Sequence, residues 1–395
     1  MTQPGMNGAR ALIETLVQSG VELCIANPGT SEMHLVQALD QVPAMRSVLT
    51  LFEGVCTGAA DGYGRMTGKP AATLLHLGPG LANGIANLHN ARKAGTPLIN
   101  IVGNHPQYHM GYDAPLTSDI DTLARNFSAW IKSCSTAETL AQDGADAVTA
   151  TLRANPGSAG QIATLIMGAD AAWNPSPGPV KANPIPQRAT VSAAHIDSIA
   201  ALFASGEKTV LLLEHDALTP AALESASRIS AKTGARLITG TFPARIDGGP
   251  GAVQVERMPY FPEQILATLE GTRNLILVGA QAPASFFAYQ NLSGRPIPEG
   301  CSTHTLARID EDAATALEQL AQSLQAATAP ISRFEKAALP KPSGPLNTRS
   351  ISQAVAATLP EGAIVATDSG GGNAAYPLCQ QAAANSWLSL TGGSI

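Results

Sequence analysis

The fold is decided by the stretch LTLFEGVCTGAADGYGR, residues 49–65 of the chain. Glu53 stands directly after a short apolar run that is typical of a strand, and the small residues after it predict a closely packed helix. This placement predicts a buried acid at the carboxyl edge of a parallel sheet, where the carboxyl group must form a hydrogen bond or shift its pKa. The alternative is that Glu53 only caps the helix that follows it.

The same strand-to-turn pattern occurs at three other places in the N-terminal part of the chain. They are IANPGTSE at 25–32, LLHLGPGLANG at 74–84 and PLINIVGNH at 97–105. Each strand ends at a polar residue or a flexible turn, and the carboxyl ends of parallel strands meet at one edge of an open α/β sheet. Ligands bind at that edge, so the four junctions together predict a ligand site.

Composition is typical of a soluble enzyme. The 395 residues are too many for one hydrophobic core and predict two to three domains. The formal net charge of −6 provides no basic surface, so no nucleic-acid partner is expected. No apolar run reaches membrane-spanning length and the N-terminus has no leader pattern, so we expect a cytoplasmic protein without a membrane partner. Five cysteines without metal-ligand spacing are expected to be reduced and mostly buried.

Several segments, taken in order, resemble the thiamine-diphosphate-dependent enzymes of the acetolactate synthase, pyruvate decarboxylase and benzoylformate decarboxylase group. They are NPGT at 27–30, EG at 53–54 with AADGYGR at 59–65, GPG at 78–80 with NG at 83–84, DSGGGN at 368–373 and TGGSI at 391–395. Residues 104–120 look most like proteins labelled acetolactate synthase large subunit. The resemblance implies an α/β fold of three doubly wound parallel-sheet domains of the thiamine-diphosphate-binding type, with the third incomplete.

The alternation of helical and strand patterns, together with this resemblance, predicts the domain boundaries. They are a pyrimidine-binding domain at 1–173, a proline-rich linker at 174–188, a central domain at 189–337, a second linker at 338–346 and the start of a diphosphate-binding domain at 347–395. Strands of the central domain are predicted at 209–213, 236–239 and 274–278. Some relatives bind FAD in this domain, but no Gly-x-Gly-x-x-Gly loop occurs here, so no FAD is expected.

The resemblance also implies Mg²⁺, bound between the diphosphate and a Gly-Asp-Gly segment with a later Asn. No Gly-Asp-Gly occurs in the sequence, so the metal ligands are expected beyond Ile395 and none is predicted within the chain. Hard divalent cations bind oxygen ligands such as those of a diphosphate. The 395 residues alone are therefore expected to be inactive.

Cofactor contacts follow from the resemblance. Glu53 is expected to be catalytic, forming a hydrogen bond with the aminopyrimidine ring and exchanging a proton with it. The Gly393 carbonyl would accept from the exocyclic amine and Ile395 would wedge between the two rings, unless this segment is only a strand end before a helix. Gly370 and Gly371 would approach the diphosphate through backbone N–H groups. The other expected cofactor-binding residues are Asn27, Pro28, Gly29 and Asn83.

On the substrate side, His76 is the main candidate, because it matches a catalytic histidine position of the benzoylformate decarboxylase branch. Histidine transfers protons near neutral pH, although a lone histidine is equally compatible with a structural role. His105 and His109 lie on the next strand-end loop and are weaker candidates. Thr30 and Ser31 would bind the substrate carboxylate, and helix capping explains them equally well.

Two functions from different classes remain open at this point. The first is a thiamine-diphosphate-dependent lyase or carboligase that acts on a small 2-oxo acid. The second is a non-catalytic regulatory or assembly subunit that retains the fold, although such a subunit has little need of Glu53. Because the family usually places its cofactor between two subunits, a homodimer or homotetramer is expected.

Overall fold

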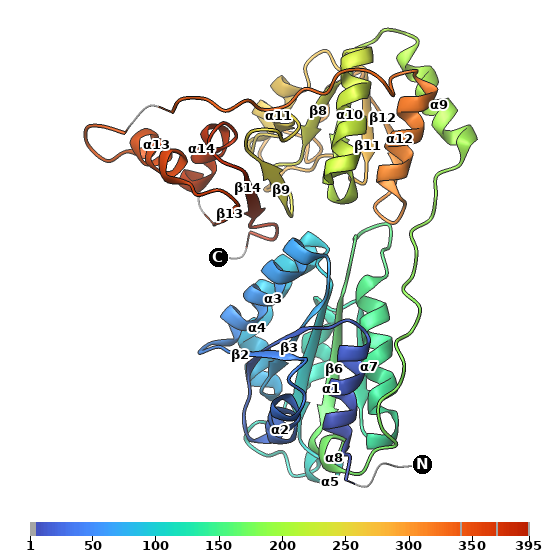
Figure 1. Ribbon diagram of the computed structural model, residues 1–395, viewed down its shortest axis with the longest axis vertical. Coiled ribbons are helices and arrows are strands. Elements are labelled where there is room, and N and C mark those ends of the chain that lie inside the picture. The colour runs from blue at the N-terminus through green and yellow to red at the C-terminus, as the bar shows by residue number, and fades with distance from the viewer. Residues whose placement is uncertain (1–4, 340–341, 369, 394–395) are drawn as a thin grey trace. The chain divides into compact units, whose positions relative to one another are not determined.

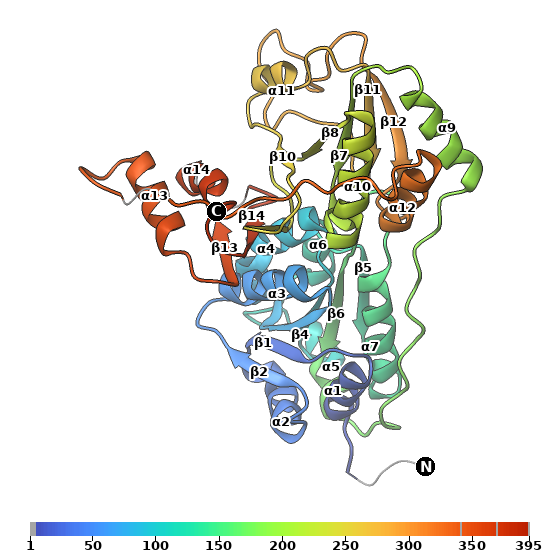
Figure 2. The same ribbon diagram turned by 45° about the horizontal axis from the view of Figure 1, so that its top comes forward.

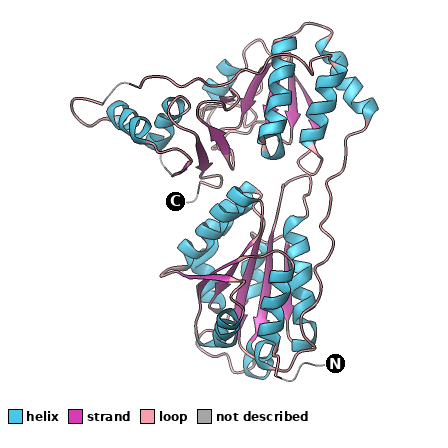
Figure 3. Ribbon diagram, in the orientation of Figure 1, coloured by secondary structure: helices cyan, strands magenta, loops and turns pink. Residues whose placement is uncertain are grey.

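The computed structural model describes residues 5–339, 342–368 and 370–393. The chain divides into two compact units, which we call the first unit (Met1–Gln187 with Thr391–Ile395) and the second unit (Arg188–Leu390) (Figure 1). Helices and strands alternate in both units, as the colours of Figure 3 show. The predicted α/β class is therefore confirmed.

Six parallel strands form the sheet of the first unit, in the order β2-β1-β3-β4-β6-β5. Their bounds are β1 (Leu23–Asn27), β2 (Arg46–Leu49), β3 (Ala71–Leu75), β4 (Leu98–Asn104), β5 (Trp130–Cys134) and β6 (Ile162–Gly168). The helices are α1 (Gly8–Gln18), α2 (Met33–Gln41), α3 (Glu53–Thr67), α4 (Leu77–Ala94), α5 (Gln107–Met110), α6 (Ile120–Arg125), α7 (Ala137–Leu152) and α8 (Ala169–Trp173). The strand order reverses between β1 and β3, and open α/β sheets bind ligands at such a switch point.

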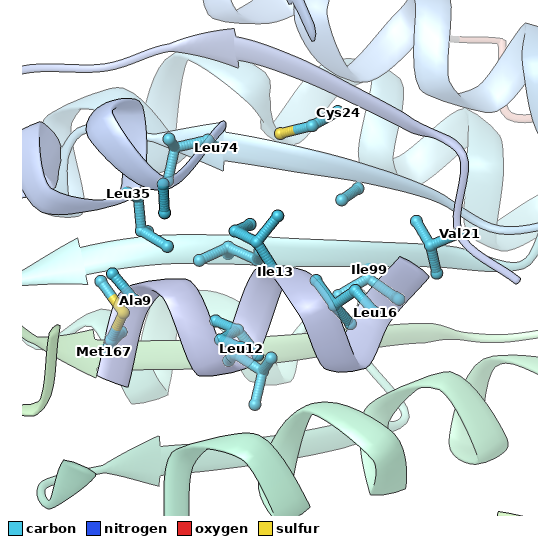
Figure 4. Packing of buried hydrophobic residues seen from close by; sticks show 14 of the residues in the cluster. Ala9, Leu12, Ile13, Leu16, Val21, Cys24, Leu35, Leu74, Ile99 and Met167 are labelled. Atoms are coloured by element: carbon cyan, nitrogen blue, oxygen red, sulfur yellow. The ribbon is translucent and has the colours of Figure 1, made fainter. Parts of the chain in front are cut away.

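Helices cover both faces of this sheet. Leu12 and Leu16 of α1 are buried in one cluster with Leu74 of β3 and Ile99 of β4 (Figure 4). The next strand residue, Leu75, belongs to a second cluster on the face that α3 and α4 cover (Figure 1). Neighbouring strand residues point to opposite faces, so burial on both faces makes these strands almost continuously apolar.

A parallel sheet in the order β10-β8-β7-β11-β12 forms the centre of the second unit (Figure 2). Its strands are β7 (Thr209–Leu213), β8 (Arg236–Thr239), β10 (Glu256–Arg257), β11 (Asn274–Val278) and β12 (Ser302–Ala307). The helices around it are α9 (Ala193–Phe203), α10 (Pro220–Thr233), α11 (Pro262–Thr268) and α12 (Ala313–Ser323). The three strands predicted for this region are confirmed at their predicted bounds.

A smaller sheet in the same unit combines distant parts of the sequence. Strands β13 (Ala363–Thr367) and β14 (Asn385–Ser389) are parallel, and β9 (Ile246–Gly248) adds to β14 in the antiparallel direction. Helices α13 (Thr348–Thr358) and α14 (Gly370–Cys379) accompany β13 and β14 in the sequence. The division of the second unit into a central and a third domain remains a prediction.

The cysteines are free thiols, as expected. Cys24, Cys56, Cys134 and Cys379 are buried and Cys301 is half-buried. Burial raises the pKa of the Cys24 and Cys56 thiols to about 12. These two thiols therefore stay protonated near neutral pH and pack as small apolar side chains.

Candidate active site

Glu53 is the first residue of α3, at the carboxyl edge of the first unit's sheet. Its Oε2 accepts a hydrogen bond from Asn83 Nδ2 at 3.1 Å, and its Oε1 has no hydrogen-bond partner among the described residues. The side chain is half-buried rather than buried as predicted, because the chain leaves the core just before it: Leu51 is 96% exposed and Phe52 is 50% exposed. Phe52 is the N-cap of α3 and no side chain caps this helix, so capping does not account for Glu53.

Gly80 lies between Glu53 and His76. A Cβ atom on Gly80 would be 3.4 Å from Glu53 Oε1 and 3.4 Å from His76 Cβ. The structure therefore brings the two principal candidates to the same glycine of α4, on the edge where β1 and β3 diverge. Sequence reasoning predicted this common edge, although the two side chains follow different strands.

His76 forms a pair with Glu32, a residue that the sequence analysis did not select. Its Nδ1 lies 2.8 Å from Glu32 Oε2, and the Gly29 N–H donates to the same oxygen at 2.7 Å. Glu32 is 0% exposed, and its Oε1 is buried without a hydrogen-bond partner among the described residues. Burial raises the pKa of Glu32, and the bonds from Gly29 and His76 oppose that rise.

The fold reserves space for the Glu32 carboxyl. A Cβ atom on Gly103, in β4, would lie 1.6 Å from Glu32 Oε1, so only glycine fits opposite this oxygen. The signal available in the sequence was a carboxyl residue three positions after Gly29, which is the spacing of a capping box. That pattern indicates a helix start, and only the fold shows that the same oxygen faces a histidine.

His105 directly follows β4 and adds a second histidine at the carboxyl edge of the sheet. Its ring centroid lies 5.1 Å from that of His109, and its Nε2 is buried without a hydrogen-bond partner among the described residues. Burial lowers the pKa of His105, and the neighbouring His109 and His76 lower it further. His109 also contacts Tyr108 and Tyr112 edge-on.

Thr30 and Ser31 lie in the short 3₁₀ turn Thr30–Glu32 that follows β1. Gly29 is the N-cap of this turn and Glu32 that of α2, so the capping alternative for Thr30 and Ser31 is wrong. A Cβ atom on Gly29 would lie 2.3 Å from His76 Nδ1, so glycine is required for this close approach. Two other predicted cofactor-binding residues come directly before Gly29. They are Asn27 and Pro28, and both are half-buried.

The remaining predicted cofactor residues fall in the C-terminal part of the chain. Gly370 and Gly371 are in the first turn of α14 in the second unit. Gly393 belongs to the first unit and has φ of +68°, a backbone conformation that favours glycine. Ile395 lies outside the described residues. In the described parts of the chain, no group of three or more His, Cys, Asp or Glu side chains is arranged to hold a metal ion.

The chain is similar to known proteins over almost its whole length. Residues 6–125 match the family described as thiamine pyrophosphate enzyme, N-terminal TPP binding domain. The chain is 47% identical to "Putative acetolactate synthase large subunit IlvX" of Mycobacterium tuberculosis over 392 residues, which cover 99% of this chain and 74% of that protein. The chain belongs to the thiamine-diphosphate-dependent enzyme family.

Solved structures of this family share the fold over almost the whole chain. The thiamine diphosphate-dependent 4-hydroxybenzoylformate decarboxylase of Rhodococcus jostii RHA1 superposes with a TM-score of 0.77 at 19% identity, covering 98% of this chain and 76% of that one. Benzoylformate decarboxylase of Polynucleobacter necessarius gives a TM-score of 0.74 at 18% identity, covering 98% and 75%. At these identities the likeness establishes the fold and leaves the substrate open.

The residues of the first unit fit the pyrimidine half of thiamine diphosphate. Glu53 Oε1 would be available to a ring nitrogen, because Asn83 donates only to Oε2 and no other partner of the carboxyl group is found in the part of the chain that the structure describes. Gly29 and Gly80 keep the adjoining backbone free of side chains that would occupy the space beside His76 and Glu53.

Proposed function

We propose that the protein is a thiamine-diphosphate-dependent lyase or carboligase acting on a small 2-oxo acid. One observation carries the proposal: Glu53, whose Oε1 has no hydrogen-bond partner among the described residues, lies across Gly80 from His76, which is paired to the buried Glu32. A carboxyl group and a histidine at one edge provide two separate proton-transfer groups. A subunit with only a structural role has no use for either.

When bound, thiamine diphosphate supplies a carbon nucleophile that attacks a carbonyl carbon and then stabilises the electron pair released by carbon–carbon cleavage. The protein's task is to hold and move protons. Glu53 would hold a proton on Oε1 against a pyrimidine nitrogen. His76 would transfer a proton at a substrate oxygen through Nε2, because Nδ1 faces Glu32. Thr30, Ser31 and His105 would bind the substrate carboxylate.

The assay that tests this function measures carbon dioxide release from a panel of 2-oxo acids, including pyruvate, 2-oxobutyrate and benzoylformate. The purified full-length protein is supplied with thiamine diphosphate and Mg²⁺, because the 395 residues alone are expected to be inactive. Ligation products are followed by mass spectrometry. We expect the protein to release carbon dioxide from at least one of these acids, and we expect the Glu53→Gln variant to release it more slowly. Cofactor binding without release or ligation for any acid would instead favour the regulatory or assembly subunit.

Glu32 is proposed as the positioning residue of His76. Glu32→Gln keeps the side-chain volume and removes the negative charge. Because the Gly29 N–H donates to the oxygen that faces His76 Nδ1, the amide oxygen should take this position and still accept from the ring, but without the charge that stabilises a protonated imidazole. We expect turnover to fall by about 100-fold or more, with little change in cofactor affinity. The ¹⁵N shifts of the His76 ring should report the change in its protonation.

The matched control is Glu22→Gln, which removes an exposed carboxylate that pairs with Lys69 in the same unit. It should change neither turnover nor the His76 shifts. Unaltered turnover together with unaltered ¹⁵N shifts in Glu32→Gln would show that the Glu32 charge has no influence on this ring.

A homodimer or homotetramer in the cytoplasm remains our proposal for the state of the protein in the cell. Its support is the usual position of the cofactor between two subunits in this family. Within the described residues, no helix has the length and apolar character needed to cross a bilayer. Sedimentation equilibrium of the protein with cofactor would measure the number of subunits.

A further inference from the structure

Strand β3 passes into helix α4 with a single residue between them. The strand ends at Leu75 and the helix begins at Leu77, so His76 directly follows the strand and is the N-cap of the helix. By comparison, residues 50–52 separate β2 from α3. The His76 backbone oxygen already accepts a helical hydrogen bond, from the Gly80 N–H at 2.9 Å. A change of direction over so short a distance requires an unusual backbone conformation.

Leu77 has this unusual conformation. Its φ is +49°, in the left-handed region, where the Cβ atom of an L residue comes too close to the following carbonyl oxygen. Glycine adopts this conformation without that clash, and a short polar side chain can offset it by bonding to the backbone. The other described non-glycine residues with positive φ all have polar side chains; they are Asp113, His215, Asn291 and Gln325. Leucine has no polar group to offset the clash, so its surroundings must hold it in this conformation.

The side chain of Leu77 is fixed by close packing. It is 0% exposed and lies in the hydrophobic cluster on the sheet face that α3 and α4 cover. Other members of this cluster are Leu75, Leu81, Val102 and Ile120. The next residue is also confined, because a Cβ atom on Gly78 would lie 2.7 Å from Ser118 Cβ. A strained backbone persists only where the surrounding structure determines it in this way.

The turn leaves the His76 ring at the edge of the sheet. The His76 side chain is 25% exposed, whereas the Glu32 side chain that it contacts is fully buried. A Cβ atom on Gly29 would lie 2.3 Å from His76 Nδ1, so the ring also lies directly against the Gly29 backbone. A displacement of the residue that carries the ring would therefore break the 2.8 Å contact between Nδ1 and Glu32 Oε2. Strained strand-to-helix turns expose reactive side chains at the edge of other α/β sheets.

We propose that Leu77 is a positioning residue, whose buried side chain holds a left-handed backbone and thereby fixes His76 against Glu32. The effect on turnover rests on the proposed function, because His76 would transfer a proton to or from the substrate. The effect on the contact between His76 and Glu32 belongs to the chain itself and requires no cofactor. Glycine at position 77 would permit the same turn, but it would permit other backbone conformations as well. The leucine side chain excludes those alternatives, because they would withdraw it from the cluster.

The first test compares glycine with alanine at position 77, by urea unfolding of the full-length protein without cofactor. Both variants remove the leucine side chain from the cluster, but only alanine keeps a Cβ atom that the left-handed backbone disfavours. We expect the equilibrium constant for unfolding to be about fivefold lower for Leu77→Gly than for Leu77→Ala. The control position is Leu81, which is buried in the same cluster, one turn further along α4, and does not have a positive φ. There the order should be reversed, with Leu81→Ala more stable than Leu81→Gly by about fivefold in the same constant.

The second test measures His76 itself. The ¹⁵N shifts of its ring are recorded without cofactor, and turnover of 2-oxo acids is measured in the full-length protein with thiamine diphosphate and Mg²⁺. In both Leu77→Gly and Leu77→Ala we expect the shifts to move toward those of a histidine in water. Turnover should fall by about tenfold or more, because a displaced catalytic group loses much of its effect. Leu77→Met, which keeps a buried apolar side chain of similar volume, should preserve both values, and so should Leu81→Ala.

Three results would overturn the positioning role. If alanine were the more stable residue at position 77 as well as at 81, the backbone at Leu77 would not be left-handed. Unaltered ring shifts in the Leu77 variants would mean that the turn holds His76 without the leucine side chain. Altered shifts with unaltered turnover would mean that the reaction does not depend on this placement. Altered shifts combined with no turnover by the unaltered full-length protein would instead uphold the placement of His76 and contradict the proposed function.

Discussion

In the full-length protein, Glu53→Gln is expected to slow hydrogen–deuterium exchange at the reactive carbon of bound thiamine diphosphate by about 100-fold or more, within the range of a positioned acid–base group. The amide of glutamine still forms a hydrogen bond with a pyrimidine nitrogen, so the cofactor should remain bound. The amide cannot exchange a proton at that nitrogen, so the step that depends on the exchange is lost. Quenched-flow deuterium exchange followed by NMR measures the rate.

The control for this variant is Glu138→Gln. Glu138 is an exposed carboxylate in the first turn of α7, so its replacement alters the charge at a helix start in the same unit without touching the site. Exchange should then proceed at the unaltered rate. Unaltered exchange in Glu53→Gln itself would remove Glu53 from the mechanism.

His76→Ala is expected to lower turnover by about 100-fold or more while leaving cofactor affinity and exchange at the reactive carbon nearly unchanged. The reason is that the two groups are proposed to act on different molecules: Glu53 on the cofactor and His76 on the substrate. Steady-state carbon dioxide release, measured beside the exchange rate, separates these two effects. A fall in both measurements would assign His76 to cofactor activation instead.

His34→Ala provides a matched control, because His34 is a half-buried histidine of the same unit that packs edge-on against Trp173. A second comparison uses the double variant of Glu32→Gln with His76→Ala. If Glu32 acts through His76, the double variant should be no slower than His76→Ala alone, because residues that act as one unit are not additive. Additive losses would mean that Glu32 contributes by a different route.

Much of the fold could be predicted from local patterns, because the strands are buried on both faces. The run at 209–213 is apolar throughout and is found as β7 at the predicted bounds. By contrast, β12 begins with polar, exposed residues, and β9 has only three residues. These two strands exist because a neighbouring strand offers hydrogen bonds, and a sequence pattern does not record its neighbours.

The position of the candidate site could also be predicted, because the carboxyl ends of parallel strands meet at one edge of the sheet. Strand ends converge at one edge, so Glu53 and His76 could be placed together from the four junctions. Glu32 could not be selected, because its partner lies 44 positions away and its position in the turn is typical of a capping residue. The left-handed backbone of Leu77 could not be predicted either, because glycine is the residue expected in that conformation.

The glycine at position 103 has a consequence for how this chain can vary. Because a methyl group there would overlap the carboxyl of residue 32, the two positions cannot mutate independently. A side chain at 103 becomes tolerable only after the acid has been shortened or lost, and with it the hydrogen bond to His76. Lineages that keep the acid should therefore keep the glycine, because the absence of a side chain in this central strand makes room for the acid that contacts His76.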